Sequence, residues 1–242
     1  MLGGYFEEGR VRAVPACAVL MVGLLASGCA QSIEGRAAAS AGAAERIPAS
    51  SAADAVGVPG PATPTGWQPV AAKRGLTYDV PPDWNVYSPG TLIGWENDEG
   101  PIRTMSGASE LKSVACSEHS RALAGVAGSG TVDLTAAAQA DAAAVESIFT
   151  SESGRVPEVI LSAPREFSVS GHPAVEISAT VRNIEQEDGC TAPSARYTVI
   201  TTTSETEPDT VVFIVTTDQG VSDAPDTGLA AKIVSTLRRS EN

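Results

Sequence analysis

The sequence predicts an α+β domain in which an antiparallel β-sheet packs against helices, preceded by a disordered tether. Long segments with strand-like alternation form a block in the second half of the chain, and helical patterns stand before and after that block. Helices that are segregated from a run of strands indicate an antiparallel sheet. From Ala30 to Gly66 there is no aromatic residue, and Ala, Ser, Gly and Pro dominate. Such a stretch buries too little apolar surface to offset the entropy of ordering, which predicts the tether.

Composition limits both the core and the partners. Hydrophobic residues make up 43% of the 242 residues but aromatic residues only 5%, so the core must consist mainly of Val, Ile, Leu and Ala. This length favours a single folded domain. The net charge of −13 argues against binding to nucleic acid and against electrostatic attachment to anionic lipid headgroups.

The N-terminus has the pattern of a bacterial lipoprotein signal peptide. Arg10 and Arg12 precede an uncharged, mostly apolar run of 15 residues, Ala13 to Ser27, which is too short to span a bilayer. The segment Leu24-Leu-Ala-Ser-Gly-Cys29 follows and resembles the bacterial lipobox. We therefore expect residues 1–28 to be a cleaved signal peptide and Cys29 to become the lipid-bearing N-terminus.

This anchor predicts the location of the protein. The only membrane contact expected is the covalent lipid on Cys29, since two acyl chains are enough for stable anchoring. The protein would then lie on the outer face of the cytoplasmic membrane or in the cell envelope. Residues 29–66 would form the lipidated linker, and residues 67–242 a single α+β domain.

Order is expected to begin near Trp67. Leu76–Val80 alternates as a strand and stops at the following Pro-Pro pair, and residues 95–101 have the chemistry of a hairpin turn. Further strands in the first half are predicted at residues 84–87, 91–95, 102–109 and 121–128.

Two helices are predicted, one on each side of the strand block. Asp133 is a good N-cap for a helix over residues 134–150. The apolar stripe of this helix consists of Leu134, Ala138, Val145, Ile148 and Phe149. The strand block itself comprises residues 156–169, 173–185, 194–204 and 210–218.

The final helix is expected to begin at Pro225 and Asp226. Its apolar face consists of Leu229, Ile233, Val234 and Leu237. We expect Lys232, Arg238 and Arg239 to stabilise the C-terminal end of this helix through its dipole.

Two cysteines remain after signal cleavage and loss of Cys17. An exported chain most simply pairs them, so Cys116 and Cys190 are predicted to form a disulfide, with two free buried thiols as the alternative. Such a bridge closes a loop of about 75 residues and is worth about 4.5 kcal/mol in the chain-entropy model.

The folded part carries a recognisable series of motifs. They are Gly75-Leu-Thr-Tyr-Asp-Val-Pro-Pro-Asp-Trp-Asn-Val86, the Gly94/Gly107 hairpin, Cys116, the Ala-rich helix, Gly171-His-Pro-Ala, Cys190-Thr-Ala-Pro and Lys232-Ile-Val-Ser-Thr-Leu-Arg238. Over about residues 67–239 the chain resembles a family of actinobacterial secreted or membrane-tethered proteins whose C-terminal domain has no assigned function. It is similar, more loosely, to the PsbP-like α/β/α fold, which implies docking of partners rather than catalysis. The resemblance supplies no catalytic residues.

The histidines limit acid–base and metal chemistry. His119 lies in Ser117-Glu-His-Ser120 and His172 lies between Gly171 and Pro173; they are the only histidines of the chain. Sequence neighbours rarely face each other as a catalytic triad requires, and no third ligand pattern stands nearby for zinc. Both histidines are therefore expected at the surface or in turns, and the sequence predicts no catalytic residue, metal ligand or cofactor.

Three other patterns are better explained by structural roles than by ligand binding. The acidic loops Glu96–Glu99 and Glu185–Asp188 lack the ligand spacing of a calcium loop and are expected to be solvated turns. The segment Gly125–Gly130 lacks the Gly-Lys-Ser/Thr ending of a phosphate loop. Core anchoring is favoured over a ligand groove for the three tryptophans, Trp67, Trp84 and Trp95.

The sequence thus favours a lipid-anchored, non-enzymatic domain that binds a partner protein or an envelope component. A module that carries a small apolar molecule or lipid is the alternative, and a hydrolase comes third. The sequence singles out no ligand-binding residues. A large apolar pocket would favour the carrier, and an exposed apolar patch over a closed core would favour the partner binder.

Overall fold

The computed structural model describes residues 61–204 and 209–240. The predicted signal peptide, Cys29 and most of the predicted linker lie outside these residues. None of the helices in the described ranges combines the length and the apolar character that crossing a membrane requires.

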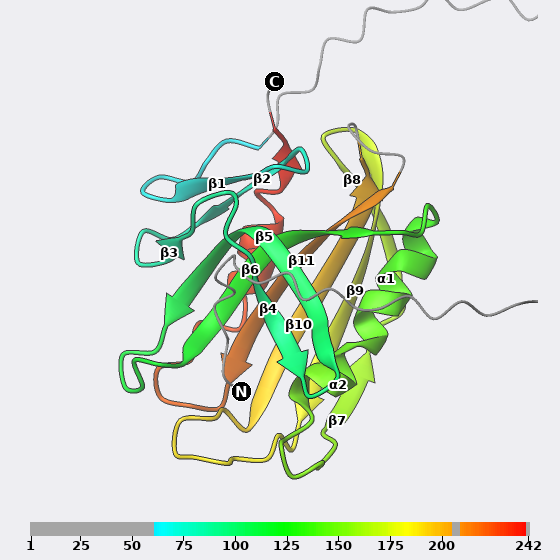
Figure 1. The fold of residues 1–242 in the computed structure, drawn as a ribbon. Coiled ribbons are helices and arrows are strands. Elements are labelled where there is room, and N and C mark those ends of the chain that lie inside the picture. Colours follow the sequence, from blue (N-terminus) through cyan, green and yellow to red (C-terminus); the bar gives the residue numbers. More distant parts are fainter. Residues whose placement is uncertain (1–60, 205–208, 241–242) are drawn as a thin grey trace, which may run out of the picture. The chain divides into compact units, whose positions relative to one another are not determined.

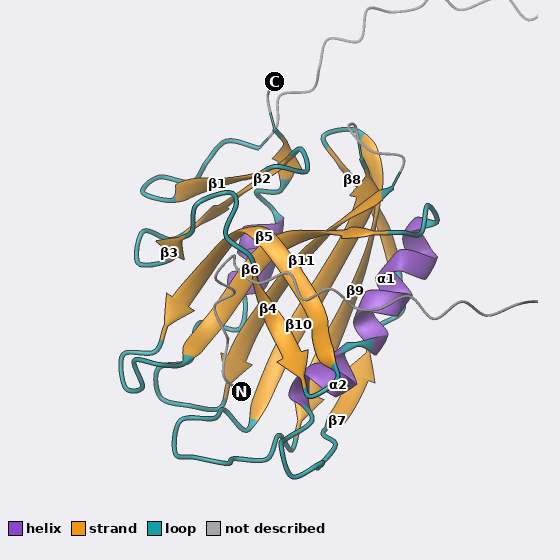
Figure 2. Cartoon of the chain, viewed as in Figure 1, coloured by secondary structure: helices purple, strands orange, loops and turns teal. Residues whose placement is uncertain are grey.

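The domain is built mostly from antiparallel β-sheet, with few helices, and so fits the predicted α+β class only loosely (Figures 1 and 2). The main sheet contains, in spatial order, β3 (Asn85–Val86), β5 (Gly100–Lys112), β6 (Ser120–Ser129), β11 (Thr210–Gln219), β10 (Ser194–Thr203), β9 (His172–Arg182) and β7 (Glu158–Leu161). In addition, β4 (Ile93–Asn97) pairs with β5, and β8 (Arg165–Val169) pairs with β9. A smaller sheet consists of β1 (Gln68–Ala72), β2 (Leu76–Val80) and β12 (Arg238–Arg239).

The first predicted helix forms as two consecutive helices, α1 (Leu134–Ala143) and α2 (Val145–Phe149). Its predicted start is confirmed, because the Asp133 carboxylate accepts a hydrogen bond from the backbone N–H of Ala136 at 2.6 Å. The apolar stripe is confirmed as well: four of its members are buried, and Leu134 packs partly buried against them.

The final helix is much shorter than predicted. Helix α3 (Leu229–Val234) has six residues, with Lys232 in its last turn. Arg238 and Arg239 were expected at the end of this helix, but they form β12 and pair with β2. The reason is tertiary: the Arg238 guanidinium makes two hydrogen bonds of 2.9 Å to the fully buried carboxylate of Asp79.

Several strands also differ from the sequence prediction. Strand β1 was not predicted, although Trp67 does stand at the start of the ordered strands. The predicted segment 156–169 is split into β7 and β8, which pair with opposite ends of β9. The predicted hairpin turn is confirmed, since β4 and β5 pair across residues 97–100.

Both faces of the main sheet are covered. On one face, α1 and α2 pack against Val199, Val212 and Ile214. On the other, the smaller sheet and α3 pack against Ile200, Phe213 and Val215. Alternate residues of β10 and β11 therefore point to two separate cores.

The tryptophans divide between these layers. Trp84 is buried in the core between the main sheet and the smaller sheet, as the core-anchor interpretation predicts. Trp67 packs partly buried against the same core. Trp95 packs partly buried against the core on the helix-bearing face, and it also lines a cavity there.

Candidate functional site

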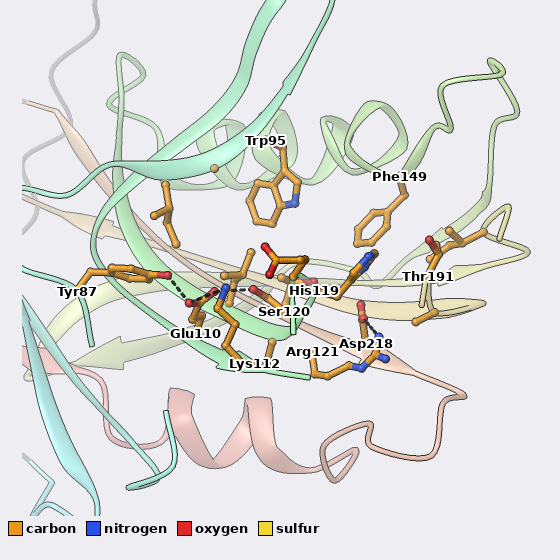
Figure 3. A pocket seen from close by; sticks show the side chains of 18 residues that line it. Tyr87, Trp95, Glu110, Lys112, His119, Ser120, Arg121, Phe149, Thr191 and Asp218 are labelled. Carbon is orange, nitrogen blue, oxygen red and sulfur yellow. Dashed lines mark hydrogen bonds and ion pairs between the residues drawn. The ribbon is translucent and has the colours of Figure 1, made fainter. Parts of the chain in front are cut away.

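A pocket of about 230 Å³ opens on the helix-bearing face of the main sheet, near one end of its strands. Strands β5, β6 and β11 supply its floor, β4 and α2 supply the opposite wall, and the loops before β6 and before β10 close its side. Figure 3 shows Trp95 and Phe149 on one side of the cavity and charged side chains on the other. The pocket therefore has an apolar wall that faces a charged floor.

Strand alternation places the charged residues on one face. On β5, Glu110 and Lys112 are two residues apart, and two-residue steps on β6 and β11 place Arg121 and Asp218 on the same side. The antiparallel pairing of β5 with β6 and of β6 with β11 brings the three strands together. Residues from distant parts of the chain thus form one charged floor.

Arg121 is the centre of this floor, and only 3% of its side-chain surface is exposed. Its guanidinium donates to Asp223 at 2.8 Å, to Asp218 at 3.2 Å and to the backbone carbonyl of Cys190 at 2.8 Å. A buried guanidinium is stable only when it is paired and hydrogen-bonded, and two carboxylates meet this need here.

The two carboxylates that pair with Arg121 differ in environment. Burial raises the pKa of Asp218 to about 6, and the opposing effect of Arg121 does not offset it. The Ser113 hydroxyl donates to Asp223 at 2.5 Å and lowers the pKa of that carboxyl. The charged form of Asp218 is therefore less well supported than that of Asp223, and Asp218 is the carboxylate that lines the pocket.

The buried Glu110 is the centre of a second cluster of polar side chains on the floor. Its carboxylate accepts hydrogen bonds from the Tyr87 hydroxyl and from the Ser120 hydroxyl, the latter at 2.6 Å. The Lys112 ammonium lies 3.5 Å from the same carboxylate (Figure 3). The contacts of Glu110 therefore join β5 and β6 to the segment that precedes β4.

The predicted disulfide is confirmed and closes one side of the pocket. Cys116 and Cys190 are bonded, with their Cα atoms 5.9 Å apart. The loops that carry them also supply Glu118, His119 and Thr191 to the pocket wall. The bridge therefore joins two loops that are remote in sequence and both contribute to the site.

His119 lies beside this bridge. Its Nε2 atom is 3.2 Å from a carboxylate oxygen of Asp188, and the side chain is 20% exposed. Hydrogen bonds from Thr191 and from the backbone N–H of Cys190 lower the pKa of Asp188 to about 2. Among the described residues the His119 ring contacts this carboxylate and no serine hydroxyl.

His119, Asp188 and Cys190 have ligand atoms close enough together to hold a metal ion. The Cys190 sulfur is, however, committed to the disulfide, so it cannot act as a thiolate ligand. The two remaining ligands, His119 and Asp188, lie on different loops and are too few for a zinc site. The set is therefore a structural cluster around the bridge.

The other candidates considered from the sequence do not line the pocket. His172 is the first residue of β9, just after the turn, and Gly125–Gly130 lies largely within β6 rather than in a loop. Glu96–Glu99 forms an exposed turn, as predicted. In the second acidic loop, the Glu185 carboxylate accepts a hydrogen bond of 2.5 Å from Ser151.

Sequence reasoning missed the charged floor. The sequence pattern places Arg121 only at the start of a strand and gives no reason to select Glu110 or Lys112. A signal was present for Asp218, which is a charged residue at the end of a strand pattern with a strongly apolar run at residues 211–215. Only the pairing of the strands shows that these residues meet.

A second buried ion pair lies outside this pocket. The Arg103 Nε atom is 2.7 Å from the Asp141 carboxylate, which links β5 to α1. Burial raises the pKa of Asp141 to about 6, against the effect of Arg103. The Tyr197 hydroxyl is buried nearby without a hydrogen-bond partner among the described residues, and its burial raises its pKa.

Comparison with known proteins identifies a family but no activity. The family described as "Domain of unknown function (DUF8017)" matches residues 60–242. No curated protein matches the chain. The match covers the whole described domain, including every residue of the pocket.

Proposed function

The chain belongs to the family "Domain of unknown function (DUF8017)", and from this premise we propose that it is a lipid-anchored, extracytoplasmic binding domain without enzymatic activity. Its binding site would be the pocket on the helix-bearing face, and its ligand a small component of the cell envelope. The observation that carries the proposal is the pocket itself, in which an aromatic wall faces a charged floor centred on the buried Arg121.

The state of the polar groups supports binding rather than catalysis. The Ser120 hydroxyl donates to Glu110, and Arg121 is held by two carboxylates and a carbonyl. Groups held in this way present a fixed surface to a ligand, which is how binding sites obtain specificity.

The proposal includes the lipid anchor, a PsbP-like architecture and an actinobacterial origin. The lipobox-like segment ending at Cys29 supports the anchor, and the net charge of −13 speaks against nucleic acid as a partner. An antiparallel sheet covered on both faces supports a PsbP-like architecture. Actinobacterial origin rests on the sequence resemblance.

Photo-crosslinking in intact cells tests the pocket as the binding site. A photoreactive amino acid replaces Thr191 at the pocket wall in the full chain on its native tether, and a matched control replaces the exposed Thr131. Intact-mass measurement should find a small adduct of defined mass at position 191 and none at position 131. A protein-sized adduct at 191 would instead support the partner-protein alternative, and equal labelling at both positions would contradict the proposal.

A further inference from the structure

We propose that the pocket binds a small organic cation, in which an ammonium group is attached to a compact apolar body. This inference rests on the proposed binding function and adds the chemical class of the ligand. It follows from the balance of charges around the cavity, from the aromatic wall and from the size of the space.

Negative charge is in excess around the cavity. Arg121 is a single cation between two carboxylates, Asp218 and Asp223. Lys112 lies beside Glu110 and balances that carboxylate. Glu118 adds an exposed carboxylate to the pocket wall. One more positive charge near Asp218 would bring the floor close to neutrality.

Asp218 is the carboxylate whose charged form such a cation would stabilise most. Its carboxylate is 23% exposed and lies 3.2 Å from the Arg121 guanidinium, which it shares with Asp223. Burial raises the pKa of Asp218 to about 6, which shows that the folded protein stabilises this anion poorly. A cation in the pocket beside this carboxylate would offset part of the loss of solvation.

The opposite wall suits the same ligand. Trp95 and Phe149 lie across the cavity from the charged floor, and Tyr87 directs its hydroxyl to Glu110 (Figure 3). Aromatic faces attract cations through their quadrupole and also bury the apolar carbon atoms attached to the charged nitrogen. A metal ion would gain nothing from this wall, whereas an organic cation uses both sides.

Anionic and larger ligands fit less well. An anion would approach Asp218, Glu110 and Glu118 while the two side-chain cations are already paired. The volume of about 230 Å³ lies below the range of about 300–1,000 Å³ of sites for drug-sized molecules. The ligand, or the part of it that enters, is therefore small.

Three probes of similar size and different charge test this inference: benzylammonium, benzyl alcohol and benzoate. Their binding to the purified full chain at pH 7.5 is measured by isothermal titration calorimetry, with Trp fluorescence as a second readout. We expect benzylammonium to bind most tightly and benzoate least.

Two variants with opposite expected effects locate the binding. Asp218→Asn should weaken benzylammonium binding about tenfold, because a partly buried charge that faces the ligand is lost. Lys112→Gln should strengthen it, because the competing cation is removed while Glu110 keeps its hydrogen bonds from Tyr87 and Ser120. Asp83→Asn, at an exposed carboxylate outside the pocket, is the matched control and should change nothing.

A third variant tests the aromatic wall. Trp95→Leu should weaken benzylammonium binding by about fivefold or more through the lost cation–π contact. Trp67→Leu, on the other face of the sheet, serves as its control. Thermal unfolding of each variant shows whether the fold is retained. If Asp218→Asn or Trp95→Leu proves unstable, the change in benzylammonium affinity of Lys112→Gln still tests the inference.

The outcomes separate this inference from the proposed function. If benzyl alcohol or benzoate binds as tightly as benzylammonium and Trp95→Leu weakens all three, the pocket is a binding site but the cation inference is wrong. Absence of saturable binding by benzylammonium also overturns the inference, while crosslinking at position 191 still decides the proposed function. A loss of affinity in Lys112→Gln would contradict the charge argument directly.

Discussion

Asp218 and Arg121 are ion-paired although 97 residues separate them in the chain. At the scale of single residues, the domain contains several carboxylates whose pKa is shifted by their surroundings. Burial raises the pKa of Asp218 and Asp141 to about 6, whereas hydrogen bonds lower the pKa of Asp188 to about 2. These opposite shifts predict how stability depends on pH.

The first prediction concerns Asp218. Its pKa is raised in the folded state from 3.8, so the folded protein holds a proton that the unfolded chain releases, and stability falls as the pH rises from about 4 to about 6. Asp141 acts in the same direction, whereas Asp188 and Asp223 add stability as the pH rises through the more acidic range. The free energy of unfolding of Asp218→Asn should therefore fall between about pH 4 and pH 6 by only about half as much as that of the wild type.

Urea unfolding at a series of pH values measures this effect. Asp83→Asn should leave the pH profile of the wild type unchanged, since that carboxylate is exposed. An unaltered profile in Asp218→Asn would show that its carboxyl does not titrate with a raised pKa.

Within the elements, Gly107 marks a bend of β5. Its φ is +50°, and the β5–β6 register shifts between Ser106 and Ser109. A Cβ atom at this position would lie 2.6 Å from the Cα atom of Ala72 on β1. The bend thus lets the smaller sheet approach the main sheet, and the Gly107 carbonyl accepts a hydrogen bond from the buried Tyr78 hydroxyl at 3.0 Å.

The second prediction follows from this contact. Gly107→Ala should lower the free energy of unfolding by at least about 2 kcal/mol, because it combines backbone strain with a steric clash. Gly130→Ala is the matched control, since nothing lies within 4 Å of a Cβ atom there. Chemical denaturation measures both, and equal stability of the two variants would show that β1 can move aside.

The third prediction concerns the bridge between Cys116 and Cys190. Replacing both cysteines with serine should lower the free energy of unfolding by about 2–4 kcal/mol, because the long loop is no longer closed in the unfolded chain. The secondary structure should persist, since neither cysteine lies in a strand. Circular dichroism and thermal unfolding measure these two effects.

A reducing agent provides the control for that variant. It should destabilise the wild type by a similar amount and leave the doubly substituted protein unaffected. Full stability of the wild type under complete reduction would mean that the ion pairs of Arg121 hold the two loops without the bridge.

At the scale of the whole molecule, the described domain and the predicted lipid anchor have separate roles. The domain supplies a pocket and two packed cores, and the anchor would hold it at the membrane. The chain carries a net charge of −13, which favours approach of cations over anions at long range. This field agrees in sign with the ligand inferred for the pocket.

The fourth prediction tests the anchor. Cys29→Ser should abolish detergent-phase partitioning, because no thiol remains at the position that would carry the lipid, and the protein should stay unprocessed or appear in the medium. Cys17→Ser, within the predicted signal peptide, should partition like the wild type. Equal partitioning of the Cys29→Ser variant and the wild type would refute the lipoprotein interpretation.

Local patterns were enough to predict much of this fold. Alternation of apolar residues located most strands of the main sheet, and the Asp133 side chain located the start of α1, because both signals depend on neighbours in the chain. The disulfide followed from the number of cysteines, and the bond between Cys116 and Cys190 confirms it.

The remaining features depend on contacts between distant segments. Arg238 leaves the final helix because the buried Asp79 binds it 159 residues away, a force that helix patterns do not contain. The pocket likewise exists because strand pairing places Glu110, Arg121 and Asp218 on one face below Trp95. Periodicity tells which side chains share a face of one strand, whereas the register between strands, set by packing of the whole domain, decides which charges meet.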